Sequence, residues 1–357
     1  MLRTPFYDPT ITYEDNYEHG PFGEFASKKN YKPKGIPDHY IFGLPVYLPF
    51  GIPAGPLLNG KFVKAAFDKG FDIAVYKTVR TKEHPCNPWP NVVSLKVKSK
   101  LTLDMQDKGV KVKQAFDQPL TITNSFGVPS KDPTIWQKDM VSTVEYARKM
   151  GGKLVIGSFQ GTTNREGSIK KYIDDFAKGA KLIKEAGVKV LEVNLSCPNE
   201  GTAHLLCFDI LRSRRVIEAI KNQIGNTPLI IKIAYFRDQR SLENLVNQIG
   251  KLVQGIATIN TMPAKIYDQR GNQALPGENR LISGTCGAGV KWAGIEMTKQ
   301  LVKLREELGF SFLIFGTGGV MEPKDYFEYR AIGADAVMSA TGAMWNPFLA
   351  QEIKNLT

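Results

Sequence analysis

The feature that most constrains this fold is a regular alternation of short buried strands and amphipathic helices from residue 47 to the end of the chain. Apolar, β-branched runs predict eight strands, at 47–55, 72–77, 153–158, 188–194, 228–235, 255–260, 312–316 and 334–340. Eight β-α units are the number that closes a (β/α)8 TIM barrel, and an open doubly wound sheet is the alternative. The predicted fold class is therefore α/β, as a TIM barrel.

Helix signals support this alternation. Asp132 followed by Pro133 predicts a capped helix to about residue 150, and Ser168 is expected to cap a helix with an apolar stripe at helical spacing. Further helices are expected near 62–69, 208–223, 240–253, 293–308, 323–331 and 346–355. Residues 47–357 are therefore interpreted as a single barrel domain.

Three segments do not follow the alternation. Residues 1–46 are rich in Tyr, Pro, Gly and Asp without a helical period, which predicts an irregular N-terminal arm packed across the barrel. Residues 79–131 contain prolines and strand-like stretches but no expected helix, and residues 263–290 are polar. A parallel crossover needs a dozen or more residues, so a strand at 119–124 is assigned to the first insertion. We expect both to be β-rich loops at the C-terminal face.

Composition limits the class of protein. The net charge of +12 favours anionic partners, but the lysines are dispersed, which argues against a nucleic-acid-binding arm. The longest apolar runs have strand length and no signal peptide is recognisable, so we expect a cytoplasmic protein without a membrane span. The four cysteines, Cys86, Cys197, Cys207 and Cys286, form no C-x-x-C pair. They are interpreted as reduced thiols, with no metal site.

Polar residues follow one predicted strand after another, and a barrel brings these positions to one face. They are Lys77 and Thr78, Ser158 and Gln160, Asn194 to Asn199, Lys232, Asn260 and Thr261, Gly318 and Gly319, and Ala340 and Thr341. Lys77 and Lys232 each end a buried strand with no carboxylate beside them in sequence. Since a buried lysine needs an anion, an anionic ligand is expected at this face.

The segment VLEVNLSCPNEG, residues 190–201, ends one of these strands with two carboxamides, a hydroxyl and a thiol. A polar turn with Cys197 as a small buried side chain would explain it structurally. The functional alternative is that Cys197 is a general base, activated by nearby cations such as Lys77 and Lys232.

The last two strand ends favour a phosphate site. FGTGGV at 315–320 lets the backbone approach a ligand, Thr341 offers a hydroxyl, and GTCGAGV at 284–290 adds a third approach. A phosphorylated ligand, a lysine near its ring system and a thiol opposite together suggest a flavin with a substrate stacked against it.

Several motifs, in one order along residues 45–345, resemble the dihydroorotate dehydrogenase family. They are YKTV (76–79), NPWP (87–90), TNSFGVPS (123–130), NLSCPN (194–199), KIAYF (232–236), INT (259–261), FGTGGV (315–320) and the Ala340-Thr341 end. The resemblance implies an FMN-dependent barrel that oxidises dihydroorotate to orotate in pyrimidine biosynthesis. A cysteine at position 197 is similar to class 1 enzymes, whereas class 2 enzymes use serine.

The resemblance also implies roles for individual residues. Cys197 would be the catalytic base, and the substrate-binding residues would be Asn124, Asn194, Asn199, Asn260 and Thr261. The FMN-binding residues would be Ala54, Gly55, Lys77, Thr78, Lys232, Gly287, Gly318, Gly319, Ala340 and Thr341. A homodimer and a fumarate-like or unknown electron acceptor are further expectations. The N-terminal arm and the segment with His204 and Cys207 depart from the family pattern.

Three alternatives stay open on sequence. A dihydropyrimidine dehydrogenase-like enzyme acting on uracil or thymine would use similar asparagines. A tRNA-dihydrouridine synthase would suit the basic charge, but its motif resembles N-x-G-C-P, whereas Ser196 precedes Cys197 here. A basic barrel that only binds nucleic acid would leave the polar strand ends unexplained.

Overall fold

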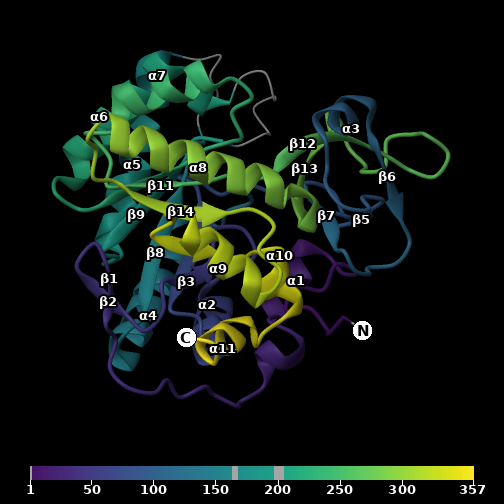
Figure 1. Ribbon diagram of the computed structural model, residues 1–357, viewed down its shortest axis with the longest axis horizontal. Coiled ribbons are helices and arrows are strands. Elements are labelled where there is room, and N and C mark those ends of the chain that lie inside the picture. Colours follow the sequence, from purple (N-terminus) through teal and green to yellow (C-terminus); the bar gives the residue numbers. More distant parts are fainter. Residues whose placement is uncertain (1, 163–167, 197–204) are drawn as a thin grey trace.

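The barrel of this chain is closed by parallel strands. The structure, a computed structural model, describes residues 2–162, 168–196 and 205–357. Its strands follow the order β3 (Phe50–Ile52), β4 (Ile73–Val79), β8 (Leu154–Phe159), β9 (Val190–Asn194), β10 (Leu229–Lys232), β11 (Gly255–Ala257), β14 (Leu313–Thr317) and β15 (Ala336–Met338), and β15 pairs with β3 (Figure 1). The closed order confirms the predicted TIM barrel and excludes an open sheet.

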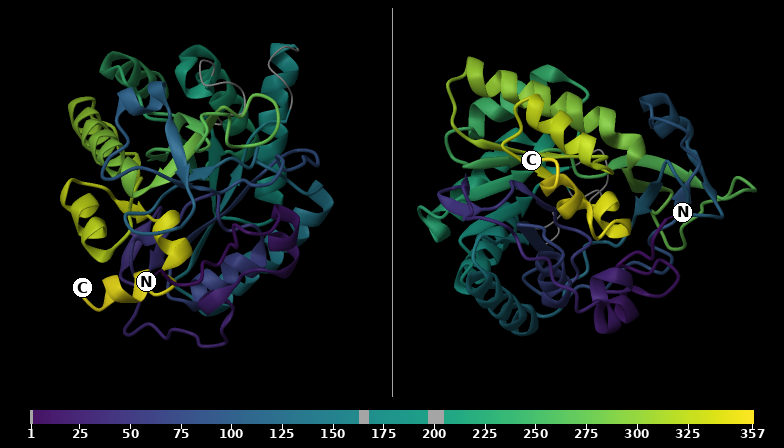
Figure 2. Two further views of the ribbon diagram at one scale, coloured as in Figure 1. Left: turned by 90° about the vertical axis from the view of Figure 1, so that its right-hand side faces the viewer. Right: turned by 60° about the horizontal axis from the view of Figure 1, so that its bottom comes forward.

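Helices surround these strands (Figures 1 and 2). They are α2 (Gly60–Asp68), α4 (Pro133–Met150), α5 (Ile169–Glu185), α6 (Ile210–Ile224), α7 (Gln239–Ile249), α8 (Lys291–Glu307), α9 (Pro323–Ala331), α10 (Thr341–Trp345) and α11 (Leu349–Lys354). The side chain of Asp132 accepts a hydrogen bond from the Thr134 N–H, as predicted for the α4 cap. Ser168 occupies the cap position of α5, but the predicted side-chain cap is wrong because no such hydrogen bond forms.

The barrel interior changes from apolar to polar along its axis. At the N-terminal ends of the strands, Ile73, Ile156 and Val190 belong to one apolar cluster. A hairpin of β1 (His39–Ile41) and β2 (Leu44–Val46) packs Ile41 and Val46 against this cluster. At the C-terminal ends, buried polar side chains replace the apolar ones. The apolar end stabilises the barrel, and the polar end is the place for a site.

The two insertions form one additional sheet beside the barrel, visible at the right of Figure 1. Its strands are β5 (Ser94–Leu95), β6 (Val110–Lys113), β7 (Thr121–Asn124), β12 (Met262–Tyr267) and β13 (Ile282–Gly287), with η5 (Ala288–Val290) following. β7 pairs antiparallel with β13, which places Asn124 opposite Gly284. The predicted 119–124 strand thus lies in the excursion, as expected.

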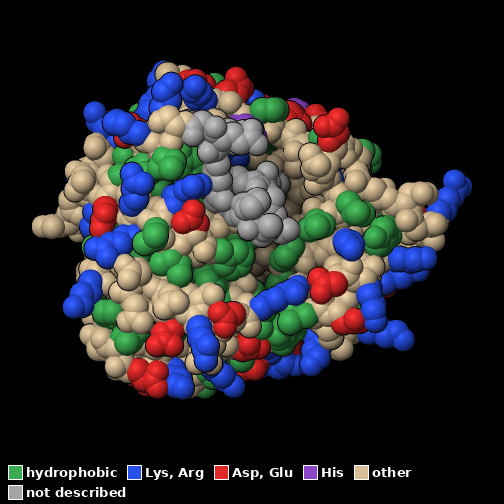
Figure 3. Space-filling model, turned by 90° about the horizontal axis from the view of Figure 1, so that it is seen from above, with side chains coloured by type: hydrophobic (Ala, Val, Ile, Leu, Met, Phe, Trp, Pro, Cys, Tyr) green, Lys and Arg blue, Asp and Glu red, His purple; other side chains and the backbone are tan. Residues whose placement is uncertain are grey.

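Two expectations about these segments are wrong. The first insertion contains a helix, α3 (Leu103–Lys108), which Thr102 caps through the Met105 N–H. The arm is not irregular throughout, because it contains α1 (Tyr13–His19) and η1 (Gly23–Ala26) in addition to the hairpin. Elements of one or two turns are too short to show a helical period. Among the described residues, no helix is long and apolar enough to cross a membrane. On the face drawn in Figure 3, Lys and Arg side chains are dispersed among the other side chains.

Candidate active site

The predicted site residues converge on two adjoining cavities at the C-terminal ends of the barrel strands. Ala54, Asn124, Lys232, Asn260 and Thr261 line both cavities. Gly287, Gly318, Gly319, Ala340 and Thr341 complete the first, and Gly55, Lys77, Thr78 and Asn194 complete the second. Cys197 and Asn199 lie outside the described residues. The barrel therefore brings together every predicted site residue that the structure describes.

A buried lysine and a buried glutamate lie at the centre of this polar end. Lys232 ends β10, and its Nζ donates to the carbonyl oxygen of Ala54 at 3.3 Å. Burial lowers the pKa of Lys232, although Glu192 on β9 and Cys286 oppose this shift. Burial raises the pKa of Glu192, against the effects of Lys232 and of a hydrogen bond from Ser158. The low-dielectric surroundings therefore make both charges expensive to hold.

Sequence reasoning missed Glu192. Its signal was a single carboxylate inside a strand whose five residues are all buried. The Ser158 hydroxyl donates to Glu192 Oε1 at 3.0 Å, and Thr78 Oγ1 lies 2.9 Å from Ser158 Oγ. This chain of hydrogen bonds crosses three neighbouring strands and fixes Thr78 at the edge of the second cavity.

The carboxamides form a second network. Asn260 Nδ2 donates to the carbonyl and the hydroxyl oxygen of Ser196, both at 3.1 Å. The Ser196 N–H donates to Asn194 Oδ1 at 3.2 Å, and the Thr261 N–H donates to Asn260 Oδ1 at 2.9 Å. These bonds fix the orientation of both asparagines. A set of oriented donors and acceptors suits a ring that carries amide groups.

A glycine pair forms the end of the first cavity. Gly318 and Gly319 have φ angles of +127° and +66°, which L side chains rarely adopt. A Cβ on Gly319 would lie 2.6 Å from the backbone nitrogen of Lys291, where α8 begins. The Tyr329 hydroxyl donates to the Gly318 carbonyl oxygen at 2.7 Å. The loop therefore keeps its backbone, without side chains, against the cavity.

Further residues line the cavities without having been assigned a role. Phe126, Gly127 and Val128 line the second cavity, and the TNSFGVPS motif was the available signal. Cys286 lines the first, and burial raises its pKa to about 11. Cys286 is therefore a neutral thiol near neutral pH and is unsuited to act as a base there.

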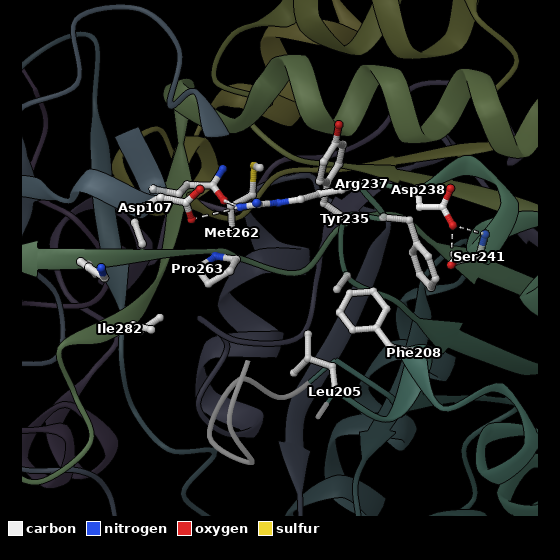
Figure 4. A pocket seen from close by; sticks show the side chains of 15 residues that line it. Asp107, Leu205, Phe208, Tyr235, Arg237, Asp238, Ser241, Met262, Pro263 and Ile282 are labelled. Carbon is white, nitrogen blue, oxygen red and sulfur yellow. Dashed lines mark hydrogen bonds and ion pairs between the residues drawn. The ribbon is translucent and has the colours of Figure 1, made fainter. Parts of the chain in front are cut away.

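A larger cavity of about 480 Å³ lies nearby but contains none of the predicted residues (Figure 4). Its walls include Leu205 and Phe208, the latter in η4 (Leu206–Phe208). Arg237 Nη2 lies 3.6 Å from Asp107 Oδ1, and Asp238 accepts from the Ser241 N–H and hydroxyl. These charged side chains have partners of their own, so volume alone does not make this cavity the reaction site.

The fold and the strand-end site together define a (β/α)8-barrel enzyme. Comparison with known proteins narrows the class: the family model described as dihydroorotate dehydrogenase matches residues 38–356. The chain is 34% identical to the dihydroorotate dehydrogenase of Dictyostelium discoideum, over 99% of this chain and 98% of that protein. The chain therefore belongs to the dihydroorotate dehydrogenase family, the flavin oxidoreductases of pyrimidine biosynthesis, as the motifs predicted.

More distant relatives agree with this assignment. The chain is 24% identical to the catalytic subunit of an NAD(+)-type dihydroorotate dehydrogenase B from Brachyspira hyodysenteriae, over 71% of this chain and 77% of that protein. Its fold is similar to that of the Eimeria tenella dihydroorotate dehydrogenase, with a TM-score of 0.70 and 18% identity, over 91% of this chain and 85% of that one.

Proposed function

We propose that this chain oxidises (S)-dihydroorotate to orotate with FMN as its cofactor and Cys197 as its general base, in the manner of class 1 enzymes. The observation that carries the proposal is the convergence, on two adjoining cavities, of all the described residues that the motifs implied. Nothing in folding alone requires lysine, carboxamide and glycine residues from separate strand ends to share these cavities.

The residues of the first cavity fit FMN. Gly318 and Gly319 leave room for a phosphate against the backbone, with Gly287, Ala340 and Thr341 around it. Lys232 lies at the junction of both cavities, where its ammonium group would face the flavin ring, and Ala54, Gly55, Lys77 and Thr78 would complete the ring site. When bound, FMN would accept the hydride that leaves the substrate.

The carboxamides would orient the substrate. Asn124, Asn194, Asn260 and Thr261 line the second cavity, and Asn199 would join them from the sequence that follows. Asn124 makes no side-chain hydrogen bond to another described residue, which leaves its amide for a ligand. The bonds between Asn260, Ser196 and Asn194 would hold the other amides in one orientation.

Cys197 directly follows Ser196 in the chain, and Ser196 is fixed by its hydrogen bonds. The Cys197 thiolate would remove a proton from one carbon of dihydroorotate while the hydride leaves the adjacent carbon. Lys77 and Lys232 would supply the positive field that favours the thiolate. Removal of the proton and the part of substrate binding assigned to Asn194 and Asn199 thus belong to one segment of the chain.

An anaerobic reduction screen tests this function. The purified protein should be yellow, and dihydroorotate should bleach its flavin absorbance, whereas dihydrouracil and tRNA containing dihydrouridine should not. A colourless protein that FMN cannot reconstitute would remove the cofactor assignment. If dihydrouracil but not dihydroorotate bleached the flavin, the chain would act as a dihydropyrimidine dehydrogenase-like enzyme. If only the tRNA bleached it, the chain would act as a tRNA-dihydrouridine synthase.

The electron acceptor and the assembly belong to the same proposal. We expect a fumarate-like acceptor and a cytoplasmic homodimer. Turnover with fumarate, quinone and NAD should be compared side by side, with the mass in solution measured by sedimentation. Turnover with NAD and this chain alone would contradict the proposed class.

A further inference from the structure

The N-terminal arm brings an aromatic ring to the edge of the proposed substrate site. Tyr7 is 2% exposed, and its ring centroid lies 5.4 Å from that of Phe126 at an interplanar angle of 87°. Tyr13 of α1 contacts the same ring, with centroids 5.9 Å apart. Phe126 lines the cavity that also contains Asn194 and Thr261. Two rings of the arm therefore pack against a side chain of the site.

Tyr7 also lies close to other residues of the proposed site, although it lines neither of the two site cavities. It lines a third cavity together with Phe126, Asn124, Gly55 and Thr341. Asn124 is a proposed substrate residue, and Gly55 and Thr341 are proposed FMN residues. The arm therefore borders the site through this third cavity.

The backbone beside Tyr7 is held firmly. The Phe6 N–H donates to the carbonyl oxygen of Met344 in α10 at 3.0 Å, and the Phe22 N–H donates to the Phe6 carbonyl oxygen at 3.0 Å. Trp89 Nε1, from the NPWP motif, donates to the carbonyl oxygen of Pro9 at 3.2 Å. Because the arm is tied on both sides of Tyr7, its ring can act as a fixed support.

The loop that carries Phe126 needs such support. Gly127 and Val128 have φ angles of +82° and +53°, and the second is unfavourable for a β-branched residue. Arg280 Nη2 donates to the Ser125 carbonyl oxygen at 3.0 Å, and Arg80 Nε donates to the Val128 carbonyl oxygen at 2.9 Å. These bonds hold the strained backbone, and the tyrosine rings hold the side chain between them.

We propose that Tyr7 is a positioning residue of the active site, which acts through Phe126 to set the affinity for dihydroorotate. This inference rests on the proposed function. It assigns the arm a role in substrate binding in addition to its role in packing.

The test compares steady-state kinetics of the FMN-loaded enzyme. Tyr7→Leu should raise the KM for dihydroorotate and the Kd for orotate about fivefold, with kcat within about twofold of wild type, as loss of an edge-to-face ring pair implies. Tyr7→Phe keeps the ring and should restore both values. In a Phe126→Leu background, Tyr7→Leu should have no further effect, because the partner ring is gone.

Phe6→Leu provides the matched control. Phe6 is the neighbouring buried aromatic of the arm, but its ring packs on Phe25 and Phe62 instead of Phe126. The Phe6→Leu variant should lower the melting temperature about as much as Tyr7→Leu and leave the KM for dihydroorotate unchanged. Equal KM changes in both variants, or an unchanged KM in Tyr7→Leu, would overturn the proposal. A wild-type enzyme inactive on dihydroorotate would instead refute the proposed function.

Discussion

The two ends of the barrel each bury lysine beside a carboxylate, but they use these charges differently. At the N-terminal end, Asp72 is fully buried, with Lys153 Nζ 2.7 Å from Oδ1 and Lys354 Nζ 2.5 Å from Oδ2. The same ammonium groups also donate to the carbonyl oxygens of Phe71 at 2.9 Å and Gly70 at 2.7 Å. This cluster connects β4, β8 and the C-terminal helix α11, so each of its charges has an oppositely charged partner within the protein.

At the C-terminal end, Lys232 lines both cavities instead, and Glu192 is buried on the adjacent strand behind it. The hydrogen bond from Lys232 to the Ala54 carbonyl oxygen is long, at 3.3 Å, and burial shifts the pKa of both side chains toward their neutral forms, as it does for Lys354 at the other end. Such an arrangement is poor for stability and suited to a ligand. The two ends therefore differ less in the type of their buried charges than in whether a buried lysine faces a charged partner or a cavity.

The largest expected effect comes from Cys197, at the functional end. Cys197→Ala should lower the rate of flavin reduction by dihydroorotate by about 10²–10⁴-fold, since a general base contributes on that scale. FMN content and orotate affinity should stay near wild type, because the proposed cofactor and amide residues are unchanged. Anaerobic stopped-flow absorbance measures the rate, and titration calorimetry measures the affinity.

Cys207→Ala is the control for this variant. The side chain of Cys207 is fully buried in the core, and its backbone N–H donates to the Leu195 carbonyl oxygen. Cys207 lines neither of the two proposed cavities. It should retain the wild-type rate of reduction. If the flavin of Cys197→Ala were reduced at the wild-type rate, Cys197 would not be the base, and the C-terminal end of the barrel would lose its proposed catalytic residue.

A matched pair of lysine substitutions tests the comparison directly. Lys232→Met should lose at least about tenfold in FMN affinity, because it removes a hydrogen-bonding cation from the proposed ring site. The apoprotein should unfold no more easily, since Glu192 can take up a proton when its cation is gone. Lys153→Met should instead cost about 3–5 kcal/mol of unfolding free energy, as expected when a buried pair is broken.

Flavin absorbance per protein and urea unfolding of both apoproteins measure these effects. Lys153→Met should retain wild-type KM and FMN content, because it lies at the opposite end of the barrel. If Lys232→Met destabilised the apoprotein as much as Lys153→Met, Lys232 would have a structural role at the C-terminal end, like that of Lys153 at the N-terminal end.

Sequence reasoning predicted most of this architecture because the periodicity of buried strands is local information. It also predicted which strand ends meet, because the barrel topology places them on one face. It could not find Glu192 as a partner of Lys232, since the two lie on adjacent strands far apart in the chain. For the same reason it missed the contact of Tyr7 with Phe126, which depends on how a non-periodic arm packs.

The smallest expected effect concerns Lys354 at the N-terminal end. Burial lowers its pKa from 10.5 to about 8, although Asp72 opposes the shift, while Lys153 and the rings of Tyr31 and Tyr47 also face it. Between pH 8 and 10.5 the unfolded chain therefore binds more protons at this residue than the folded chain does. Its contribution to the unfolding free energy should rise with pH across this window, by about 1–3 kcal/mol.

Urea unfolding of wild type and Lys354→Met at several pH values measures this contribution as a difference, which cancels the lysines common to both proteins. If the difference in unfolding free energy between the two proteins did not change up to pH 10.5, Asp72 would keep Lys354 charged in the folded protein. The attraction between Lys354 and Asp72 would then fully offset the cost of burying the ammonium group.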